Sequence, residues 1–389
     1  MISQVDCIGC QACVDFCPQK AISFQYDKWG EGKAVVDLTQ CNNCGLCELR
    51  CPGKINTFNE AQKRVYAAVS REHRYTGSSG GVFYELASQF IRDGGAVFGA
   101  AFDENLKLIH KKATTTEELL ELCKSKYLHS DMSGVYAEIS NCLKNGQKVM
   151  FVGTPCQTSA VKNLFIKKYE HQLVLVDFLC HGTGTQKIFD MCVKEEEKRK
   201  NGKIVDFVFR AKSKRAEHSF RYKLKNGNKI KTVSGYSFEF PYYYSYLKYN
   251  IFNESCYECK YTSCERVGDI TLGDFWGIQN YDKKLKDCDG VSMLSLNTQK
   301  GKELFEQIKF TCDVYEYPIE NAANNNQAFR ESVGEHIHNS KRELLKVLES
   351  NGETALMEKM SCPNIRKNRI YAKTPMFVKK AWDYIRGKR

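Results

Sequence analysis

Short apolar runs alternate with segments of helical periodicity over residues 65–340. The runs at 95–102, 148–153 and 173–178 have the length of buried strands, and residues 82–92 have the pattern of a helix. This alternation predicts a larger α/β domain over 65–340. Ligands gather outside the carboxyl ends of strands in an open parallel sheet, so side chains that follow two successive strands are expected to be neighbours.

A second pattern follows in the middle of the chain. Phe220, Tyr222 and Leu224 occupy alternate positions in a basic stretch, which predicts a hairpin that turns at Asn226–Gly227 and leaves one face exposed. The tyrosine-rich segment 242–247 is expected to pack in the core, beside the cysteines that come after it.

Composition narrows the class of protein. The chain has 389 residues, of which 42% are apolar and 27% charged, and its formal net charge is +12. This length suits two or three domains with buried cores. The apolar fraction is too high for a disordered chain, and no apolar run approaches the ~18 residues that span a bilayer. The amino terminus lacks the pattern of a signal peptide, so we expect a reducing, cytoplasmic location.

Cysteine is abundant and unevenly distributed. There are 19 cysteines, and because this number is odd they cannot all be paired in disulfides within the chain. In a reducing compartment, abundant cysteine indicates metal binding. Eight of them form two runs of identical spacing, C-x2-C-x2-C-x3-C-P, and the second run follows the first by 34 positions, as in an internal repeat. The runs are Cys7, Cys10, Cys13 and Cys17, then Cys41, Cys44, Cys47 and Cys51.

This spacing is typical of two cubane iron–sulfur clusters. Three thiolates at i, i+3 and i+6 surround one cluster, and the fourth, which precedes a proline, binds the other cluster. A pair of zinc sites is the alternative, but zinc ligands come in two close pairs and fit these runs poorly. The first [4Fe-4S] cluster then takes Cys7, Cys10, Cys13 and Cys51, and the second takes Cys41, Cys44, Cys47 and Cys17.

Residues 1–60 strongly resemble a bacterial-type ferredoxin with two [4Fe-4S] clusters. The resemblance implies an α+β, ferredoxin-like cluster domain in front of the larger α/β domain. Short apolar segments at 21–24, 34–36 and 55–58 predict strands that accompany the cluster loops. Clusters of this type carry single electrons, so this domain does not by itself imply a substrate.

Four later cysteines form a further candidate cluster site. Cys156 and Cys180 each follow a predicted strand, and Cys256 and Cys259 form a C-x2-C pair. Four thiolates can hold a third [4Fe-4S] cluster. Three alternatives stay open on spacing alone: a buried cysteine that acts as a small apolar residue, a nucleophile at Cys156, and a zinc site at the C-x2-C pair.

Six short motifs occur in order along the second domain. Together they resemble the beta-subunit family of coenzyme F420-reducing hydrogenases and dehydrogenases, over about residues 65–340. The resemblance implies a domain that binds FAD and an iron–sulfur cluster and exchanges electrons with a deazaflavin. By position, it implies that Cys156, Cys180, Cys256 and Cys259 are the ligands of the third cluster. The motifs are Ser78–Gly81, Ser125–Tyr127, Gly153–Gln157, Cys180–Gly182, Ser255–Lys260 and Asp269–Gly277.

A cofactor seat is indicated directly before the predicted helix 82–92. Two hydroxyls and two amides without side chains can hold a pyrophosphate at a helix N-terminus, and a helix cap with a flexible lead-in is the alternative. No G-x-G-x-x-G is present, so a Rossmann site is not indicated. The four residues are Ser78, Ser79, Gly80 and Gly81.

Further cofactor contacts come from the other motifs. Lys126 is a candidate for contact with a phosphate or a ring, against the alternative of a solvated lysine, and the resemblance adds Tyr127 and Thr154. His181 and Asp274 are candidates to face the flavin or its partner, with no role assigned. No catalytic acid or base is required, because the flavin supplies the chemistry.

Two departures from the family pattern stand out. Cys264 is a fifth thiol, which either replaces one of the four ligands or is not a ligand. His129 stands where the family often has glutamine.

The carboxyl-terminal segment 341–389 is predicted to be a helical, basic tail. Its last part, 363–389, has nine basic residues and one acidic residue, with apolar side chains between them. This pattern fits contact with an anionic membrane surface or an acidic partner, and a solvated terminus is the alternative. No recognition motif accompanies the charge, so nucleic-acid binding is not expected.

These features predict an iron–sulfur flavoprotein oxidoreductase. Electrons would pass between a reduced deazaflavin or another small donor, FAD and the [4Fe-4S] clusters, and then to a redox partner protein or small acceptor. The first alternative is a non-catalytic electron-transfer subunit that serves a partner enzyme, for example in glycan biosynthesis. The second is a binding module that has lost the redox chemistry of the family.

Overall fold

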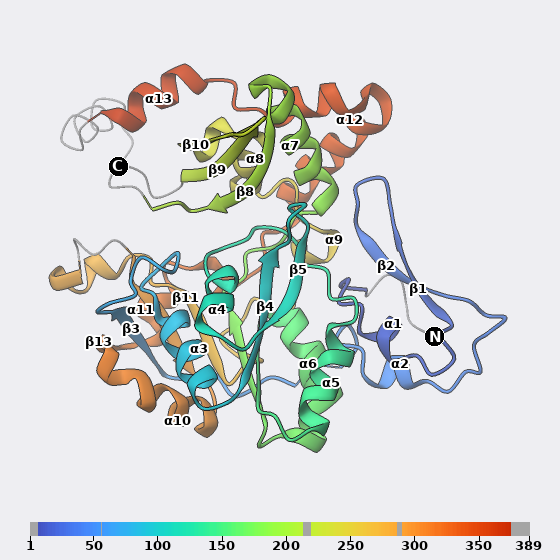
Figure 1. Cartoon of the computed structure of the whole chain (residues 1–389), viewed down its shortest axis with the longest axis vertical. Coiled ribbons are helices and arrows are strands. Elements are labelled where there is room, and N and C mark those ends of the chain that lie inside the picture. The colour runs from blue at the N-terminus through green and yellow to red at the C-terminus, as the bar shows by residue number, and fades with distance from the viewer. Residues whose placement is uncertain (1–6, 56, 213–218, 286–289, 375–389) are drawn as a thin grey trace.

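The computed structural model describes residues 7–55, 57–212, 219–285 and 290–374. Figure 1 shows a central sheet, a smaller sheet above it, and an amino-terminal module that projects to one side. The mixed α/β architecture predicted from the alternating pattern is confirmed, with one large sheet at its centre.

The central sheet has eight strands in the order β13-β3-β12-β11-β7-β6-β4-β5. Its inner pairs β4–β6, β6–β7 and β7–β11 are parallel, and the other pairs are antiparallel. The strands are β3 (Arg64–Ser70), β4 (Ala96–Phe102), β5 (Leu108–Ala113), β6 (Val149–Gly153), β7 (Leu173–Phe178), β11 (Ile270–Asp274), β12 (Ser292–Leu296) and β13 (Cys312–Pro318).

Helices cover both faces of this sheet. One face packs on α3 (Val82–Arg92), α4 (Thr116–Leu122) and α10 (Gln299–Ile308), through an apolar cluster that includes Leu86 and Phe305. The other face packs on α5 (Val135–Lys144) and α6 (Pro155–Tyr169). Because both faces are buried, the parallel strands are almost continuously apolar, which explains why they stand out as short apolar runs.

The smaller sheet has three antiparallel strands, β8 (Lys203–Phe209), β9 (Ser219–Asn226) and β10 (Lys229–Tyr236). The hairpin β9–β10 turns directly after Asn226, as the alternation predicted, with Phe220, Tyr222 and Leu224 facing the core. An aromatic cluster joins this sheet to the helices around it. These helices are α7 (Gln186–Lys200), α8 (Pro241–Leu247) and α12 (Glu335–Met360), and α13 (Ile365–Lys373) follows without a buried residue.

The predicted boundary between residues 340 and 341 lies within α12, which contributes Leu344, Leu356 and Met360 to this core. No helix in the described part of the chain has the length and apolar character that a bilayer crossing requires. The apolar and basic positions from 375 onward lie outside the described residues.

The amino-terminal module contains α1 (Ala12–Phe16), β1 (Ile22–Tyr26), β2 (Gly32–Val36) and α2 (Leu46–Leu49). β1 and β2 are antiparallel and form the two predicted strands at 21–24 and 34–36. The strand predicted at 55–58 is wrong for the described residues, which are irregular there. Instead, Asn59 pairs with Arg266, so the chain is already bound to the large domain at this point and is not available to β1 and β2.

Candidate iron–sulfur and cofactor sites

The repeat of 34 positions is visible in the backbone of the two cysteine loops. Gly9 and Asn43 both have left-handed φ, and so do Gln11 and Gly45. The helices α1 and α2 begin directly afterwards, at equivalent positions. Left-handed residues turn the chain sharply, which lets three cysteines of each loop surround one space. All eight predicted ligands line a single cavity of 300 Å³ between the loops.

The first loop is fixed to the large domain. Tyr136 donates a hydrogen bond of 2.6 Å to the carbonyl of Cys10, and Gln11 Oε1 accepts one of 2.6 Å from the Met132 amide. Cys10 is buried, and burial raises the pKa of its thiol. In contrast, Cys44 of the second loop is exposed. The first cluster position therefore faces the large domain, and the second faces outward.

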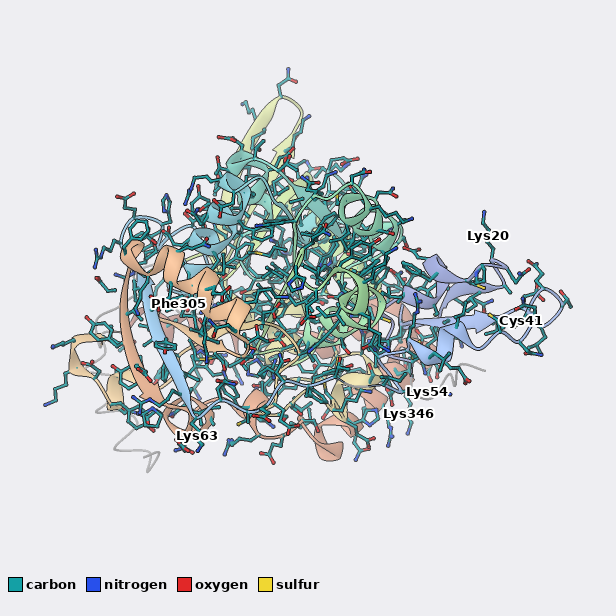
Figure 2. All side chains as sticks on the ribbon, turned by 90° about the horizontal axis from the view of Figure 1, so that it is seen from below. Lys20, Cys41, Lys54, Lys63, Phe305 and Lys346 are labelled. Carbon is teal, nitrogen blue, oxygen red and sulfur yellow. The ribbon has the colours of Figure 1, made fainter. Side chains whose placement is uncertain are left out.

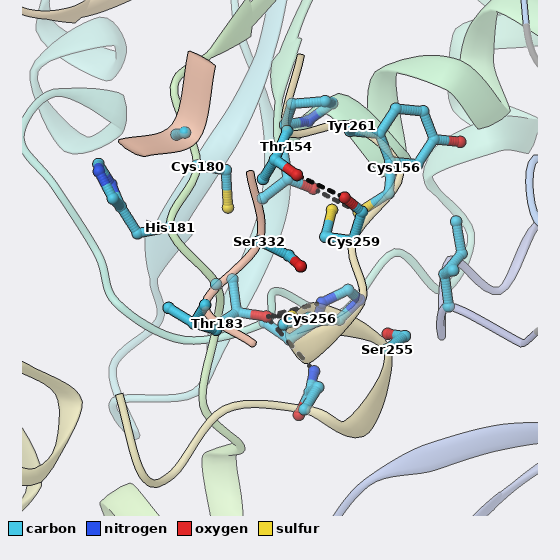
Figure 3. Close-up of a pocket in the computed structure, with 18 of the residues that line it drawn as sticks. Thr154, Cys156, Cys180, His181, Thr183, Ser255, Cys256, Cys259, Tyr261 and Ser332 are labelled. Carbon is cyan, nitrogen blue, oxygen red and sulfur yellow. Dashed lines mark hydrogen bonds between the residues drawn. The ribbon is translucent and has the colours of Figure 1, made fainter. Parts of the chain in front are cut away.

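The four later cysteines come together at the carboxyl end of the central sheet. Cys156 lies at the start of α6, Cys180 follows β7, and Cys256 and Cys259 lie on and after α9 (Glu254–Tyr257). All four line one small cavity of 40 Å³, and Figure 3 shows them around this space. The expectation that residues after successive strands are neighbours is thus met for Cys156 and Cys180.

Burial and mutual repulsion shape the chemistry of these thiols. Burial, and to a lesser extent the neighbouring Cys259 thiol, raise the pKa of Cys156 to about 11 and that of Cys256 to about 12. Thiolates bind iron, so these cysteines need a positively charged centre among them to lose their protons. In the part of the chain that the structure describes, no three His, Cys, Asp or Glu side chains are grouped for a single metal ion.

Cys264 lies apart from these four thiols. Its Sγ is 3.4 Å from the carbonyl oxygen of Phe329, and its side chain packs against an apolar cluster under β3 and β12. Burial raises the pKa of this thiol, and none of the four cysteines contributes to the shift. Of the two possibilities left open by the sequence, the geometry favours a cysteine that is not a ligand.

Arg266 connects the loops that carry the cysteines. Its guanidinium donates to the carbonyls of Tyr261 and Ser263 at 2.9 and 3.1 Å, next to the Cys259 loop. It also donates to the carbonyl of Phe178 at 3.2 Å, two residues before Cys180. This role was not predicted, because an arginine between a cysteine loop and a strand has no distinctive sequence pattern.

A second cavity of 520 Å³ lies beside the four-cysteine cavity. The segment from Cys180 to Thr183, together with Thr154, lines both cavities and separates them. Figure 3 shows His181 directed away from the space among the cysteines. Of the seven predicted cofactor contacts, Gly80 does not line the larger cavity. The six that do are Ser78, Ser79, Gly81, Lys126, Tyr127 and Thr154.

Gly81 stands at the N-cap of α3 with a left-handed φ and no side-chain cap hydrogen bond, so the pyrophosphate seat at Ser78–Gly81 stays a prediction and the capping alternative gains no support. Ser78 Oγ accepts a hydrogen bond of 2.8 Å from the Ser125 amide, and Ser292 Oγ accepts one of 2.9 Å from the Gly80 amide. A Cβ on Gly80 would meet the Ala68 carbonyl at 2.3 Å, so this glycine is required by close backbone packing. Ser79 Oγ is buried and has no hydrogen-bond partner among the described residues.

Basic groups face this cavity. Lys126 Nζ donates to the carbonyls of Glu121 and Cys123 at 2.9 and 2.7 Å, which holds it at the cavity wall. Burial lowers the pKa of Lys126 to about 7. Arg210, which begins the basic stretch before the hairpin, forms an ion pair with Asp274 in the same wall.

Aromatic rings and a histidine complete the cavity. Tyr127 stacks on Tyr246 with ring centroids 4.3 Å apart, and His181 lies against Trp276 at 5.1 Å. His181 Nε2 and Arg210 Nε are buried without a hydrogen-bond partner in the described residues. A large cavity with apolar walls and a few unsatisfied polar groups is typical of a site for a small molecule or cofactor.

His129 lies between the first ferredoxin loop and the four cysteines. Its Nε2 is 3.2 Å from the carbonyl of Gly9, and its Nδ1 is 3.3 Å from Thr183 Oγ1. Thr183 Oγ1 in turn lies 3.9 Å from Cys256 Sγ. His129, which stands where the family often has glutamine, therefore lines the four-cysteine cavity.

Comparison with known proteins identifies two regions. Residues 6–55 match the 4Fe-4S dicluster domain. Residues 146–320 match the family of the carboxyl-terminal part of the coenzyme F420 hydrogenase/dehydrogenase beta subunit. These matches confirm the two resemblances found in the sequence. They support the two amino-terminal clusters and leave the third cluster and FAD to be tested.

Individual relatives agree with this assignment. The coenzyme F420-dependent sulfite reductase of Methanocaldococcus jannaschii is 24% identical over 317 residues, which are 69% of this chain and 46% of that protein. The ferredoxin-type protein NapF of Haemophilus influenzae is 36% identical over 56 residues, 14% of this chain and 32% of that protein. The chain thus spans about half or less of the length of these two relatives.

A solved structure is also similar. A chain of the F420-reducing [NiFe] hydrogenase complex from Methanosarcina barkeri aligns with 75% of this chain and 92% of its own length. The sequence identity is 17% and the TM-score is 0.45.

Proposed function

Because residues 6–55 form a 4Fe-4S dicluster domain and residues 146–320 belong to the coenzyme F420 hydrogenase/dehydrogenase beta-subunit family, we propose that this protein is an iron–sulfur flavoprotein oxidoreductase. A reduced small donor, of the deazaflavin class or another hydride donor, would deliver electrons to FAD in the large cavity. The electrons would then leave through three [4Fe-4S] clusters.

The shared wall between the two cavities is the observation that carries this proposal. Cys180 and His181 each border both the space among the four thiols and the larger cavity. A molecule in the larger cavity is then separated from a cluster by one short stretch of backbone. This arrangement suits transfer of electrons over a short distance.

The size and the chemistry of the large cavity support FAD as its ligand. Its volume of 520 Å³ lies within the ~300–1,000 Å³ common for cofactor sites. Ser79 Oγ and the Arg210 Nε group are buried without partners among the described residues and can hydrogen-bond to a ligand, since unsatisfied buried polar atoms are costly. Lys126 adds a positive charge for phosphate when it is protonated. FAD, when bound, supplies hydride acceptance and single-electron release.

The protein's own residues would bind the flavin and the third cluster. Tyr127 and Tyr246 stack in the cavity wall, and Arg210 is held in place by Asp274. The four-cysteine site supports a cubane cluster, because its four thiols line one common cavity. The larger cavity therefore provides the cofactor seat, and the smaller one provides the adjacent electron acceptor.

The contacts of His129 and Tyr261 support one order for the proposed clusters. His129 reaches from Thr183, beside Cys256, to the carbonyl of Gly9 in the first ferredoxin loop. The Tyr261 hydroxyl donates to the carbonyl of Pro52 at 2.9 Å, directly after a ligand of the first cluster. Electrons would pass from the third cluster to the first, and from the first to the outer second cluster.

The proposal is tested by the cofactor content of protein purified without air. We expect about twelve irons and one FAD per chain, from three four-iron clusters. Cys180→Ser should lower the iron content by about four while the dicluster signals remain. A content of about eight irons without flavin would overturn the proposal and leave a ferredoxin joined to a binding module.

The donor is identified by anaerobic mixing experiments. Reduced deazaflavin, NADH and NADPH are each mixed with the loaded protein, and bleaching of the flavin absorbance is followed. Bleaching by one of them establishes the oxidoreductase and its donor class. If none bleaches the flavin in fully loaded protein, the chain is an electron-transfer subunit, a result compatible with its covering 46% of the sulfite reductase.

A further inference from the structure

The thiol of Cys156 lies against the hydroxyl of the residue that caps its helix. Thr154 is the N-cap of α6, and its Oγ1 is 3.0 Å from Cys156 Sγ. Figure 3 shows the two side chains next to each other. Thr154 is buried and lines both cavities of the site. Cys41 of the second cysteine run, in contrast, lies at the tip of the amino-terminal module in Figure 2. A hydrogen bond to Cys156 therefore forms away from bulk water, where such bonds are electrostatically stronger.

This hydrogen bond can run in one direction when Cys156 binds iron. A free thiol could donate to Thr154, but a cysteine that binds a metal is a thiolate and has no proton to give. Thr154 Oγ1 accepts a hydrogen bond of 3.4 Å from the Gln157 amide, which leaves the proton of its own hydroxyl available. The Thr154 hydroxyl is then the donor, and Cys156 Sγ is the acceptor.

A second acceptor competes for the Thr154 proton. Gln157 Oε1 is 3.0 Å from Thr154 Oγ1, and it also accepts a hydrogen bond of 3.3 Å from the Thr154 amide. This oxygen therefore keeps a hydrogen bond when the hydroxyl turns toward Cys156. The sulfur carries negative charge when it binds iron, and hydrogen bonds to charged groups are roughly twice as strong as those between neutral groups. The competition thus favours Cys156.

A buried chain of polar side chains fixes the orientation of Gln157. Its Nε2 donates to the carbonyl and the Oγ of Ser130 at 3.3 and 2.9 Å, so its Oε1 faces Thr154. Ser130 Oγ lies 2.7 Å from His110 Nδ1, and His110 Nε2 lies 3.1 Å from the Val152 carbonyl. A carbonyl only accepts, so Nε2 carries the proton of the neutral ring. Burial lowers the pKa of His110 to about 4, which keeps the ring neutral at pH 7. Ser130 therefore donates to His110 and accepts from Gln157.

We propose that the Thr154 hydroxyl donates a hydrogen bond to the Cys156 sulfur of the third cluster and thereby raises the reduction potential of that cluster. The inference rests on the proposed function, because it requires the third cluster. Reduction adds one negative charge to the iron–sulfur group, and a hydrogen-bond donor to a ligand sulfur stabilises the more negative state. Since Thr154 also lines the larger cavity, this residue would set the driving force for electron transfer out of that cavity.

A second threonine beside these thiols is placed differently. Thr183 Oγ1 is 3.9 Å from Cys256 Sγ, so any hydrogen bond to that sulfur is weak. The same oxygen is 3.3 Å from His129 Nδ1 and 3.3 Å from Asn253 Nδ2. Thr183 therefore provides a matched control, because it is a threonine in the same two cavity walls with a more distant sulfur.

The test is a redox titration of the full-length protein, purified without air and monitored by EPR. The signal of the third cluster is identified as the one that Cys180→Ser removes. Thr154→Val should lower the equilibrium constant for reduction of this cluster about tenfold, which is about 59 mV for one electron. Thr154→Ser keeps the hydroxyl and should stay within about twofold of the wild-type constant, and so should Thr183→Val.

Thr154→Val also removes the N-cap of α6, so two further variants separate the cap from the hydrogen bond. Glycine is tolerated at N-cap positions, and Thr154→Gly should lower the potential as Thr154→Val does. Thr115 closes the same kind of capping box on α4, outside both cavities. Thr115→Val should therefore leave the potential of the third cluster unchanged.

Iron content distinguishes the possible failures. If all proteins hold about twelve irons and the potential is unchanged in Thr154→Val and Thr154→Gly, the hydrogen bond does not set the potential and the proposed function stands. Loss of about four irons in both variants would also overturn the inference, since the hydroxyl would then serve assembly of the site. So would a tenfold fall in Thr154→Ser. About eight irons in the wild-type protein would overturn the proposed function, and this inference with it.

Discussion

Arg266 and Asp177 form an ion pair inside the protein, with Nη2 of Arg266 3.3 Å from Oδ1 of Asp177 and both side chains almost fully buried. Asp177 also accepts hydrogen bonds from the amides of Val267 and Gly268. The pair thus joins the end of β7, just before Cys180, to the loop that follows Cys259. It sets the positions of these cysteines relative to one another.

We predict that Arg266→Lys reduces the iron content from about twelve to about eight per chain. Lysine keeps the charge but cannot reach Asp177 and three carbonyls at once, because it lacks the planar guanidinium. Iron analysis and the spectra of the ferredoxin clusters are the measurements. Arg64→Lys, which alters an exposed ion pair with Glu316, is the control. Full iron in Arg266→Lys would show that the pair does not position the cluster ligands.

Cys264 and Cys259 should differ sharply when each is replaced by serine. Cys259→Ser removes a thiol from the four-cysteine cavity and should cost about four irons per chain. Cys264→Ser should leave the iron content unchanged, because its Sγ lies against the carbonyl of Phe329 and outside that cavity. Iron and sulfide analysis of both variants decides the question. A loss of iron in Cys264→Ser would show that Cys264 is a cluster ligand in place of one of the four proposed cysteines.

FAD affinity should depend on pH through Lys126. Its pKa of about 7 means that Lys126 is a cation below pH 7 and loses its proton as the pH rises through that value. Phosphate binding favours the cation, so the affinity for FAD should fall from pH 6 to pH 8, by about tenfold at most. Fluorescence titration of deflavinated protein measures this dependence.

Lys126→Met should bind FAD weakly at pH 6 and show a flat profile between pH 6 and 8. Lys148→Met changes an exposed lysine that does not line the cavity and should keep the wild-type profile. A wild-type pH profile in Lys126→Met would assign the dependence to another group.

A buried charge group attaches the amino-terminal module to the large domain. Lys341 is paired with Glu31 from the β1–β2 hairpin and, at 3.2 Å, with Glu254, which begins α9. Both Lys341 and Glu31 are buried. Glu31 also accepts a hydrogen bond of 3.0 Å from the Glu254 amide, two residues before Cys256.

We predict that Lys341→Met lowers the free energy of unfolding by about 3–5 kcal/mol, because Glu31 is left as an unpaired buried charge. Denaturant unfolding measures the loss, and limited proteolysis should show earlier cleavage near residue 60. Lys28→Met is the matched control, since Lys28 pairs with Glu349 across the same two elements but in solvent, and should cost at most about 1 kcal/mol. Equal stabilities for the two variants would contradict the prediction.

The parts of this fold that the sequence could predict are those governed by local pattern. α3 and β7 have the predicted bounds, and β4 and β6 begin one residue later than predicted. The three strands could be located because buried parallel strands are continuous apolar runs. The two cysteine loops could be predicted for a similar reason, because the spacing of the cysteines along the chain determines how each loop can surround a cluster.

The parts that could not be predicted depend on contacts between distant segments. The segment 55–58 has the composition of a strand, but Lys162 donates to the Thr57 carbonyl at 2.9 Å and holds it on α6. Arg210, directly after β8, lines the larger cavity and pairs there with Asp274, which is 64 positions away in the sequence. No periodicity records such contacts, so Arg210 and Arg266 were not identified as site residues.

The pairing of Glu31 with Lys341 also constrains how the protein is made. The two residues are 310 positions apart, so at ~5–20 residues per second a ribosome needs roughly 15–60 seconds to deliver the lysine after the glutamate. During that interval the nascent module has no attachment through Lys341. Both cysteine loops of the module are therefore synthesised well before α12 can pair with the hairpin that lies between them.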